Sequence, residues 1–105
     1  MEIRKACSTD IEYIAAHNIL LARESENKTI SPETARQGVQ AILDDPAKGF
    51  YLVAVDEQRI VGELMVTYEW SDWRACNIWW LQSVYVTPSQ RQQGIFTRLL
   101  GTLRK

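Results

Sequence analysis

The sequence predicts one α+β domain with a mainly antiparallel sheet, in the element order β-α-α-β-β-β-α. Three observations lead to this class. Two helical segments with recognisable start signals lie within residues 9–44, apolar and polar residues alternate from Gly49 to Val86, and a last helix begins near Gly94. The 105 residues suffice for one core, and they contain no repeat, linker or low-complexity segment.

The first two elements are a short strand and a helix. Glu2 to Ala6 is predicted to be the strand. The run Thr9-Asp10-Ile11-Glu12 fits a capping box, with Thr9 as the N-cap. Asn18 interrupts the apolar stripe of the helix, so this helix is expected to face a partly polar neighbour. The charged run 23–28 is expected to be a loop.

The second helix has clear signals at both ends. Ser31 is expected at the N-cap and Pro32 at the first helical position. Pro46 ends the segment, because the residue before a proline avoids the α conformation. The predicted buried stripe consists of Ala35, Val39, Ile42 and Leu43.

Three strands follow the second helix. Phe50 to Val55 and Arg59 to Tyr68 are predicted to pair through the tight polar turn at 56–58, with Gly62 marking a bulge. Cys76 to Val86 is predicted to be the next strand.

Composition excludes several classes of partner. The net charge of −1 gives no electrostatic reason to expect nucleic acid or an anionic membrane. Cys7 and Cys76 are expected to be free thiols of a cytoplasmic protein, although one disulfide stays open as an alternative. One histidine and two separated cysteines predict no metal site. His17 is expected to be a surface or packing residue.

The most informative segment is residues 83–100. A β-branched strand, a proline turn and a polar loop lead there into a helix that opens on Gly94. This order directs unpaired N–H groups and the positive end of a helix dipole at one point beyond the strand. Such a point binds phosphate without needing a particular side chain.

Two stretches carry a resemblance to a known family. Val84-Tyr85-Val86-Thr87-Pro88 followed by Arg91-Gln92-Gln93-Gly94-Ile95 resembles the acetyl-CoA signature of the GNAT (GCN5-related N-acetyltransferase) superfamily. The resemblance implies the family's three-layer αβα-like fold and acetyl transfer from acetyl-CoA to a primary amine. Phe96 departs from the family pattern, which has Gly or Ala there. If its N–H still points inward, its ring is expected to turn towards the core or the helix flank.

The resemblance also implies where acetyl-CoA binds. Backbone groups of Val84 and Val86 would hold the pantetheine amides, and Val84 N–H would stabilise the oxyanion. Arg91 would contact the 3′-phosphate end or remain a solvated loop cation. The remaining expected contacts, made by backbone N–H groups and one hydroxyl to the pyrophosphate, come from Gln92, Gln93, Gly94, Ile95, Phe96 and Thr97.

The general base would be a carboxylate near the acceptor pocket, and Glu63 and Glu69 are the candidates. Glu63 has opposite parity to Leu64 and Val66, so it could equally face solvent. The four tryptophans also allow two interpretations. They pack in the core and against helices, or Trp70 and Trp73 line an acceptor pocket beside Glu69 and Asp72.

The family domain continues beyond its acetyl-CoA helix with a further strand and helix, so residues 1–105 are expected to be a partial domain. The strand 76–86 would then expose an unpaired edge, and a homodimer formed through this edge is expected. Two functions remain open: an active N-acetyltransferase for an unknown amine, or a truncated, non-catalytic module that self-associates.

Overall fold

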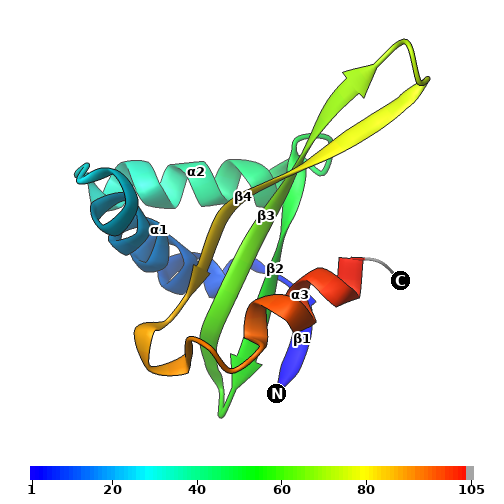
Figure 1. Ribbon diagram of the computed structural model, residues 1–105. Helices are drawn as coiled ribbons and strands as arrows, with labels where there is room; N and C mark the ends of the chain where they lie inside the picture. Colours follow the sequence, from blue (N-terminus) through cyan, green and yellow to red (C-terminus); the bar gives the residue numbers. More distant parts are fainter. Residues whose placement is uncertain (104–105) are drawn as a thin grey trace.

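The computed structural model describes residues 1–103 and confirms the predicted order of elements (Figure 1). Short 3-10 turns, η1 and η2, precede the first and last helices. The elements are β1 (Glu2–Lys5), η1 (Ser8–Asp10), α1 (Ile11–Glu26), α2 (Pro32–Asp44), β2 (Gly49–Asp56), β3 (Arg59–Ser71), β4 (Cys76–Val86), η2 (Pro88–Gln90) and α3 (Ile95–Leu103).

The sheet lies between two layers of helix. Its strands follow the order β1-β2-β3-β4, and every neighbouring pair is antiparallel. Helices α1 and α2 cover one face and α3 covers the other (Figure 1). Strand β2 serves both cores because alternate side chains face opposite sides: Tyr51 and Val53 face α1 and α2, whereas Leu52 and Ala54 face α3. The predicted α+β class and its three layers are confirmed.

The helix starts agree with the sequence in one case and differ in the other. Ser31 caps α2 as predicted, since its hydroxyl accepts from Thr34 N–H at 3.1 Å. The prediction of Thr9 as the N-cap of the first helix is wrong. Residues 8–10 form a 3-10 turn, and the Asp10 carboxylate accepts from Cys7 N–H at 2.8 Å while it also binds Arg4. Arg4 holds the Asp10 carboxylate in the position from which it accepts a hydrogen bond from Cys7 N–H.

The end of α1 lies later than the sequence suggested. The charged run expected as a loop is mostly helical, because α1 continues to Glu26. Asn27 then ends the helix in the left-handed conformation with φ 52°, a conformation that asparagine tolerates. Glu24 is thereby held on the last turn of the helix, beside the site described below.

Two bulges interrupt the regular pairing of the sheet. The register passes from Ala54–Gly62 to Val55–Ile60, so Val61 is the extra residue next to the glycine that predicted it. On the other side of β3, the register passes from Glu63–Tyr85 to Met65–Gln82. Two β4 residues, Ser83 and Val84, therefore face one residue of β3, and Ser83 has a positive φ of 51°.

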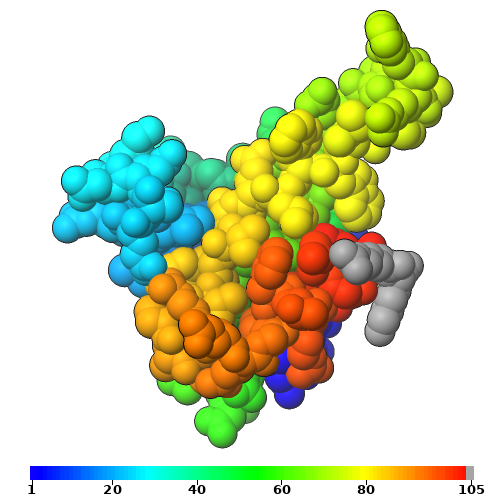
Figure 2. All heavy atoms as spheres, in the orientation of Figure 1, coloured from blue at the N-terminus to red at the C-terminus, as the bar shows by residue number. Residues whose placement is uncertain are grey.

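The outer part of the β3–β4 hairpin projects from the body of the protein (Figures 1 and 2). Its four tryptophans are half exposed or more, so the prediction that they pack in the core is wrong. Trp79 meets Phe50 edge-on at 5.7 Å, and Trp80 Nε1 donates to Glu69 at 2.8 Å from the opposite face. The exposed fractions are 64% for Trp70, 96% for Trp73, 51% for Trp79 and 53% for Trp80.

Within residues 1–103, no helix combines the length and the apolar character needed to cross a bilayer.

The close approach of β2 to β3 at Gly49 gives a stability prediction. Gly49 has φ 148°, and a Cβ there would overlap the backbone carbonyl of Val66. We expect Gly49→Ala to lower the free energy of unfolding by about 1–3 kcal/mol, measured by urea denaturation. Gly38→Ala is the matched control, because its Cβ would meet nothing within 4 Å. That change in the middle of α2 should raise stability by up to ~1 kcal/mol. Equal effects of the two changes would contradict the account.

Candidate active site

Two cavities meet at the bulge in β4. The first, of about 420 Å³, lies between β4, the following loop and the start of α3, and Val84 lines it. The second, of about 480 Å³, lies between α1 and α2, above the middle of the sheet, and Ser83 lines it. Leu21 of α1 borders both. We call them the loop cavity and the helix groove; the consecutive residues 83 and 84 join them.

The loop cavity is shaped by the backbone of residues 90–97. Gln92 and Gly94 have positive φ values of 66° and 80°, which turn successive N–H groups inward. The first bond within α3 runs from Arg98 N–H to the Gly94 carbonyl at 3.0 Å. The N–H groups of residues 95–97 therefore have no acceptor within the helix, which is the arrangement that binds a phosphate.

A missing side chain lets α3 approach the sheet. A Cβ on Gly62 would lie 2.8 Å from Ile95 Cγ2 and 3.5 Å from Leu99 Cδ1. Both of these α3 residues are buried against β2 and β3. The glycine therefore fixes where the free N–H groups of the helix lie relative to β4.

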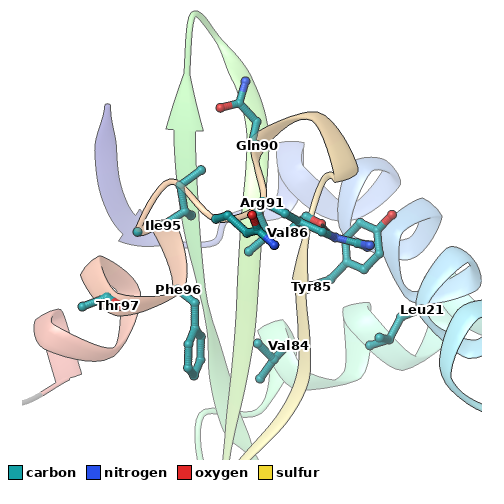
Figure 3. Close-up of a pocket in the computed structure, with 11 residues that line it drawn as sticks. Leu21, Val84, Tyr85, Val86, Gln90, Arg91, Ile95, Phe96 and Thr97 are labelled. Atoms are coloured by element: carbon teal, nitrogen blue, oxygen red, sulfur yellow. Dashed lines mark hydrogen bonds between the residues drawn. The ribbon is translucent and has the colours of Figure 1, made fainter.

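Eight of the nine residues predicted to bind acetyl-CoA line the loop cavity. The exception is Gln93, whose side chain donates to the Ser89 carbonyl at 3.4 Å. Of the two expected directions for the Phe96 ring, the core is wrong, because the ring lines the loop cavity. Phe96 is 39% exposed and reaches the level of Val84 (Figure 3). The residues that match are Val84, Val86, Arg91, Gln92, Gly94, Ile95, Phe96 and Thr97.

The open edge of β4 presents backbone groups to the loop cavity. Thr87 N–H donates to the Val61 carbonyl at 2.9 Å, so Thr87 and Tyr85 turn their backbone groups towards β3. Val84 and Val86 consequently turn theirs outward. Arg91 Nε donates to the Val86 carbonyl at 2.8 Å from that outer side, which agrees with this orientation.

Arg91 connects the loop to α1. Its Nη2 lies 2.8 Å from Glu24 Oε1, and its guanidinium lies 5.2 Å from the centre of the Tyr85 ring. Tyr85 Oη donates to the other oxygen of Glu24 at 3.2 Å. Figure 3 shows the arginine side chain directed at Tyr85. Arg91 is thus bonded to α1 and β4 and is not simply a solvated loop cation, whereas its contact with the 3′-phosphate end stays a prediction.

The helix groove has a polar floor and mostly apolar walls. Asn18 Nδ2 donates to Tyr51 Oη at 3.1 Å, which explains why Asn18 interrupts the apolar stripe of α1. Asn18 Oδ1 is buried and has no partner within residues 1–103. The walls are formed by Leu21, Ala22, Ile30, Ala35, Val39, Ile42 and Met65, and Glu26 lies among the remaining lining residues.

Glu63 is buried beneath α1 and lines neither cavity, although its neighbours Tyr85 and Met65 line one each. Its side chain is 0% exposed, and its Oε1 lies 3.0 Å from Nδ1 of His17. Burial raises the pKa of the Glu63 carboxyl to about 7, and the bond to His17 opposes that rise. The solvent-facing alternative for Glu63 is therefore wrong.

Glu69, the other candidate base, lies far along the hairpin. It pairs with Ile78 and bonds Trp80, and it lines neither cavity. Ser83 of the bulge is five positions along the strand from Ile78, which corresponds to roughly 17 Å. Trp70 and Trp73 are equally absent from the walls of the helix groove.

The described residues give no metal site: within 1–103, no three His, Cys, Asp or Glu side chains are grouped to hold a metal ion. Cys7 and Cys76 are both free and exposed.

A sheet with an open edge, a bulge and a loop-to-helix anion cradle at the same point is the arrangement that the resemblance to the GNAT superfamily implies. Comparison with known proteins agrees, because residues 13–105 match the Acetyltransferase (GNAT) family. The chain belongs to this family, whose members are acyltransferases that use acetyl-CoA as cosubstrate. No curated protein sequence matches the chain.

Solved structures show the same fold. A possible acetyltransferase from Clostridium difficile is 43% identical, with a TM-score of 0.91 over 98% of this chain and 68% of that one. An integron cassette protein from a salt-marsh metagenome is 19% identical, with a TM-score of 0.89 over 97% of this chain and 66% of that one. A predicted acetyltransferase from Clostridium acetobutylicum, solved with acetyl-CoA, is 17% identical, with a TM-score of 0.78 over 97% and 70%. The chain thus spans about two thirds of the length of each.

Sequence reasoning missed the partners that α1 contributes. Nothing in the spacing of His17 or Glu24 pairs them with residues of β3 and β4 more than forty positions away. The one available signal was polar character inside an amphipathic stripe, and it identified Asn18 alone.

Because its pKa is raised, the charge on Glu63 lowers the free energy of unfolding at high pH. The folded state holds this proton to a higher pH than the unfolded chain, so the contribution to stability is full below 4.5 and is lost as the pH rises through about 7. Glu63→Gln mimics the neutral acid. We expect it to stabilise the protein at about pH 8, by at most ~3 kcal/mol, and to change little at about pH 5.

Urea unfolding of both proteins at the two pH values measures this difference. A loss of stability in Glu63→Gln that is the same at both pH values would contradict a raised pKa.

Proposed function

We propose that this chain transfers the acetyl group of acetyl-CoA to the primary amine of an acceptor that enters through the helix groove. The observation that carries this proposal is the meeting of the two cavities at Ser83 and Val84. A cofactor held in one cavity and an acceptor held in the other would bring their reactive ends to the same two residues.

On this proposal the backbone supplies most of the cosubstrate contacts. The outward groups of Val84 and Val86 would pair with the pantetheine amides, and the N–H groups of residues 92–97 would receive the pyrophosphate. The Phe96 ring would lie along the pantetheine arm beside Val84, in keeping with its direction in Figure 3. Arg91 would support the loop by its bonds to Glu24 and Val86.

The chemistry needs three functions at the bulge. The amine must lose a proton, the developing oxyanion needs a donor, and the leaving thiolate needs a proton. Val84 N–H, on the open edge, is the proposed oxyanion donor. Glu63 is the proposed base in preference to Glu69, because it lies one register step from the bulge and has a pKa of about 7.

The shape of the helix groove restricts the acceptor. Apolar walls and a cavity of about 480 Å³ suit a small amine on an apolar body or the end of a peptide chain. Glu26 among its lining residues favours a cationic acceptor. Both cavities are formed, which favours catalysis over a purely structural module. We propose the cytoplasm as its location, where the two exposed free thiols would remain reduced.

Binding of acetyl-CoA is tested by thermal unfolding. Excess acetyl-CoA at about a hundred times its dissociation constant should stabilise the native chain by about 2.7 kcal/mol and raise Tm by several degrees. Phe96→Glu, which places a negative charge in the loop cavity, should abolish the rise. Trp73→Glu makes the same change of charge at the hairpin tip and should leave the rise intact. An unchanged Tm in the unaltered protein would refute the proposed cosubstrate site.

We also propose that two copies associate through the outer edge of β4. That strand is last in the sheet, and most of residues 76–82 are exposed. An exposed apolar strand edge favours pairing with another strand. Sedimentation equilibrium should detect a dimer, and replacing the exposed apolar residue Leu81 by lysine should shift it towards monomer. A monomer at the highest concentration tested would rule this association out.

A further inference from the structure

His17 is the only histidine of the chain, and it is buried. It lies on the face of α1 that covers the sheet, and its exposed fraction is 9%. Its ring centre is 5.1 Å from that of Tyr85, with the two planes inclined at 37°. Packing against Tyr85 fixes the plane of the His17 imidazole, and α1 fixes the distance of the imidazole from the sheet.

The imidazole holds one oxygen of Glu63 and leaves the other free. His17 Nδ1 is 3.0 Å from Oε1, whereas Oε2 is buried and has no partner within residues 1–103. Leaving a carboxylate oxygen unpaired in the interior costs free energy. A buried polar atom without a partner, such as Glu63 Oε2, is therefore a candidate for a catalytic role or for contact with a bound molecule.

Glu63 itself lines neither cavity, but its neighbours in the sheet line both. Glu63 pairs with Tyr85, which lines the loop cavity, and it lies two residues before Met65, which lines the helix groove. All three side chains are on the α1 face. The bulge residues Ser83 and Val84 are the next step of the register.

Few other ionisable groups act on Glu63. Tyr51 of β2 interacts with its charge, and burial together with that charge raises the pKa of Tyr51. Tyr85 faces it from β4, while Glu24 and Arg91 bond one another beyond Tyr85. His17 is the only one of these groups that bonds the Glu63 carboxylate.

We propose that His17 is a positioning residue for acetyl transfer: it donates its Nδ1 proton to Glu63 Oε1 and so presents Oε2 as the proton acceptor at the junction of the two cavities. This inference rests on the proposed function. It assigns to α1 a part in the reaction that neither the sequence motif nor the lining of the cavities indicates.

The amine loses two protons during acetyl transfer, and each has an acceptor. The protonated amine gives one proton to Glu63 Oε2, directly or through one water, and becomes nucleophilic. Its nitrogen forms a bond to the thioester carbon, and the C–S bond breaks. The second proton lost by the nitrogen passes to the departing thiolate, so the products are the amide, free coenzyme A and a protonated Glu63.

The test compares His17→Leu with His17→Asn. Asparagine retains an N–H donor near the position of Nδ1, whereas leucine retains none. In protein labelled with ¹³C at glutamate side-chain carboxyls, Glu63→Gln identifies the Glu63 signal. We expect the Glu63 titration midpoint to rise by about one pH unit in His17→Leu, and by less in His17→Asn.

The same variants are then assayed with acetyl-CoA and a panel of alkyl and aralkyl primary amines. His17→Leu should lower kcat/KM about fivefold at pH 7, since a rise of the Glu63 pKa from about 7 to about 8 lowers its ionised fraction from about a half to about a tenth. The loss should disappear at about pH 9, where Glu63 is ionised in either protein. Leu20→Ala, an exposed position on the same helix, is the matched control and should change neither readout.

Each outcome decides one claim. An unchanged Glu63 midpoint in His17→Leu, or an activity loss of equal size at every pH, would overturn the positioning role. If the unaltered protein binds acetyl-CoA but acetylates none of the amines, this result contradicts the proposed function. The carboxyl titration still tests the His17–Glu63 pair in that case.

Discussion

The bulge at Ser83–Val84 is the constraint on which the rest of the site depends. An extra residue in β4 against one residue of β3 turns the strand, and a positive φ at Ser83 maintains that turn. Beyond it, Val84 and Val86 present their backbone groups at the open edge. Without the bulge, the strand would run on in regular pairing, and the loop cavity and helix groove would not meet at consecutive residues.

Close packing on both faces of the sheet holds this geometry in place. Gly62 allows Ile95 to lie against the sheet, which brings the free N–H groups of α3 next to the strand edge. On the other face, Arg91, Glu24 and Tyr85 connect the loop and β4 to the end of α1. The buried Glu63–His17 pair lies between these contacts. The ionised form of Glu63 lowers the stability of the fold, but it provides the site with a proton acceptor. Function and stability often oppose each other in this way.

The sequence predicted what local patterns and one motif can encode. Alternation and helix-start signals gave the element order, and the loop before α3 gave eight cavity-lining residues. It failed where tertiary contacts decide. Arg4 holds the Asp10 carboxylate where it accepts from Cys7 N–H, and Thr9 does not cap the helix. The tryptophans lie on a projecting hairpin. Glu63 is buried because α1 places His17 over it. No periodicity shows which helix lies over which strand.

The most direct test of the central claim is an amide chemical-shift map of the ¹⁵N-labelled chain titrated with acetyl-CoA. We expect the largest shifts at Val84, Val86 and residues 92–97, with smaller shifts at His17 and almost none at the hairpin tip near Trp73. Shifts confined to the hairpin, or spread evenly over the chain, would contradict a cosubstrate site built on the β4 bulge and the start of α3.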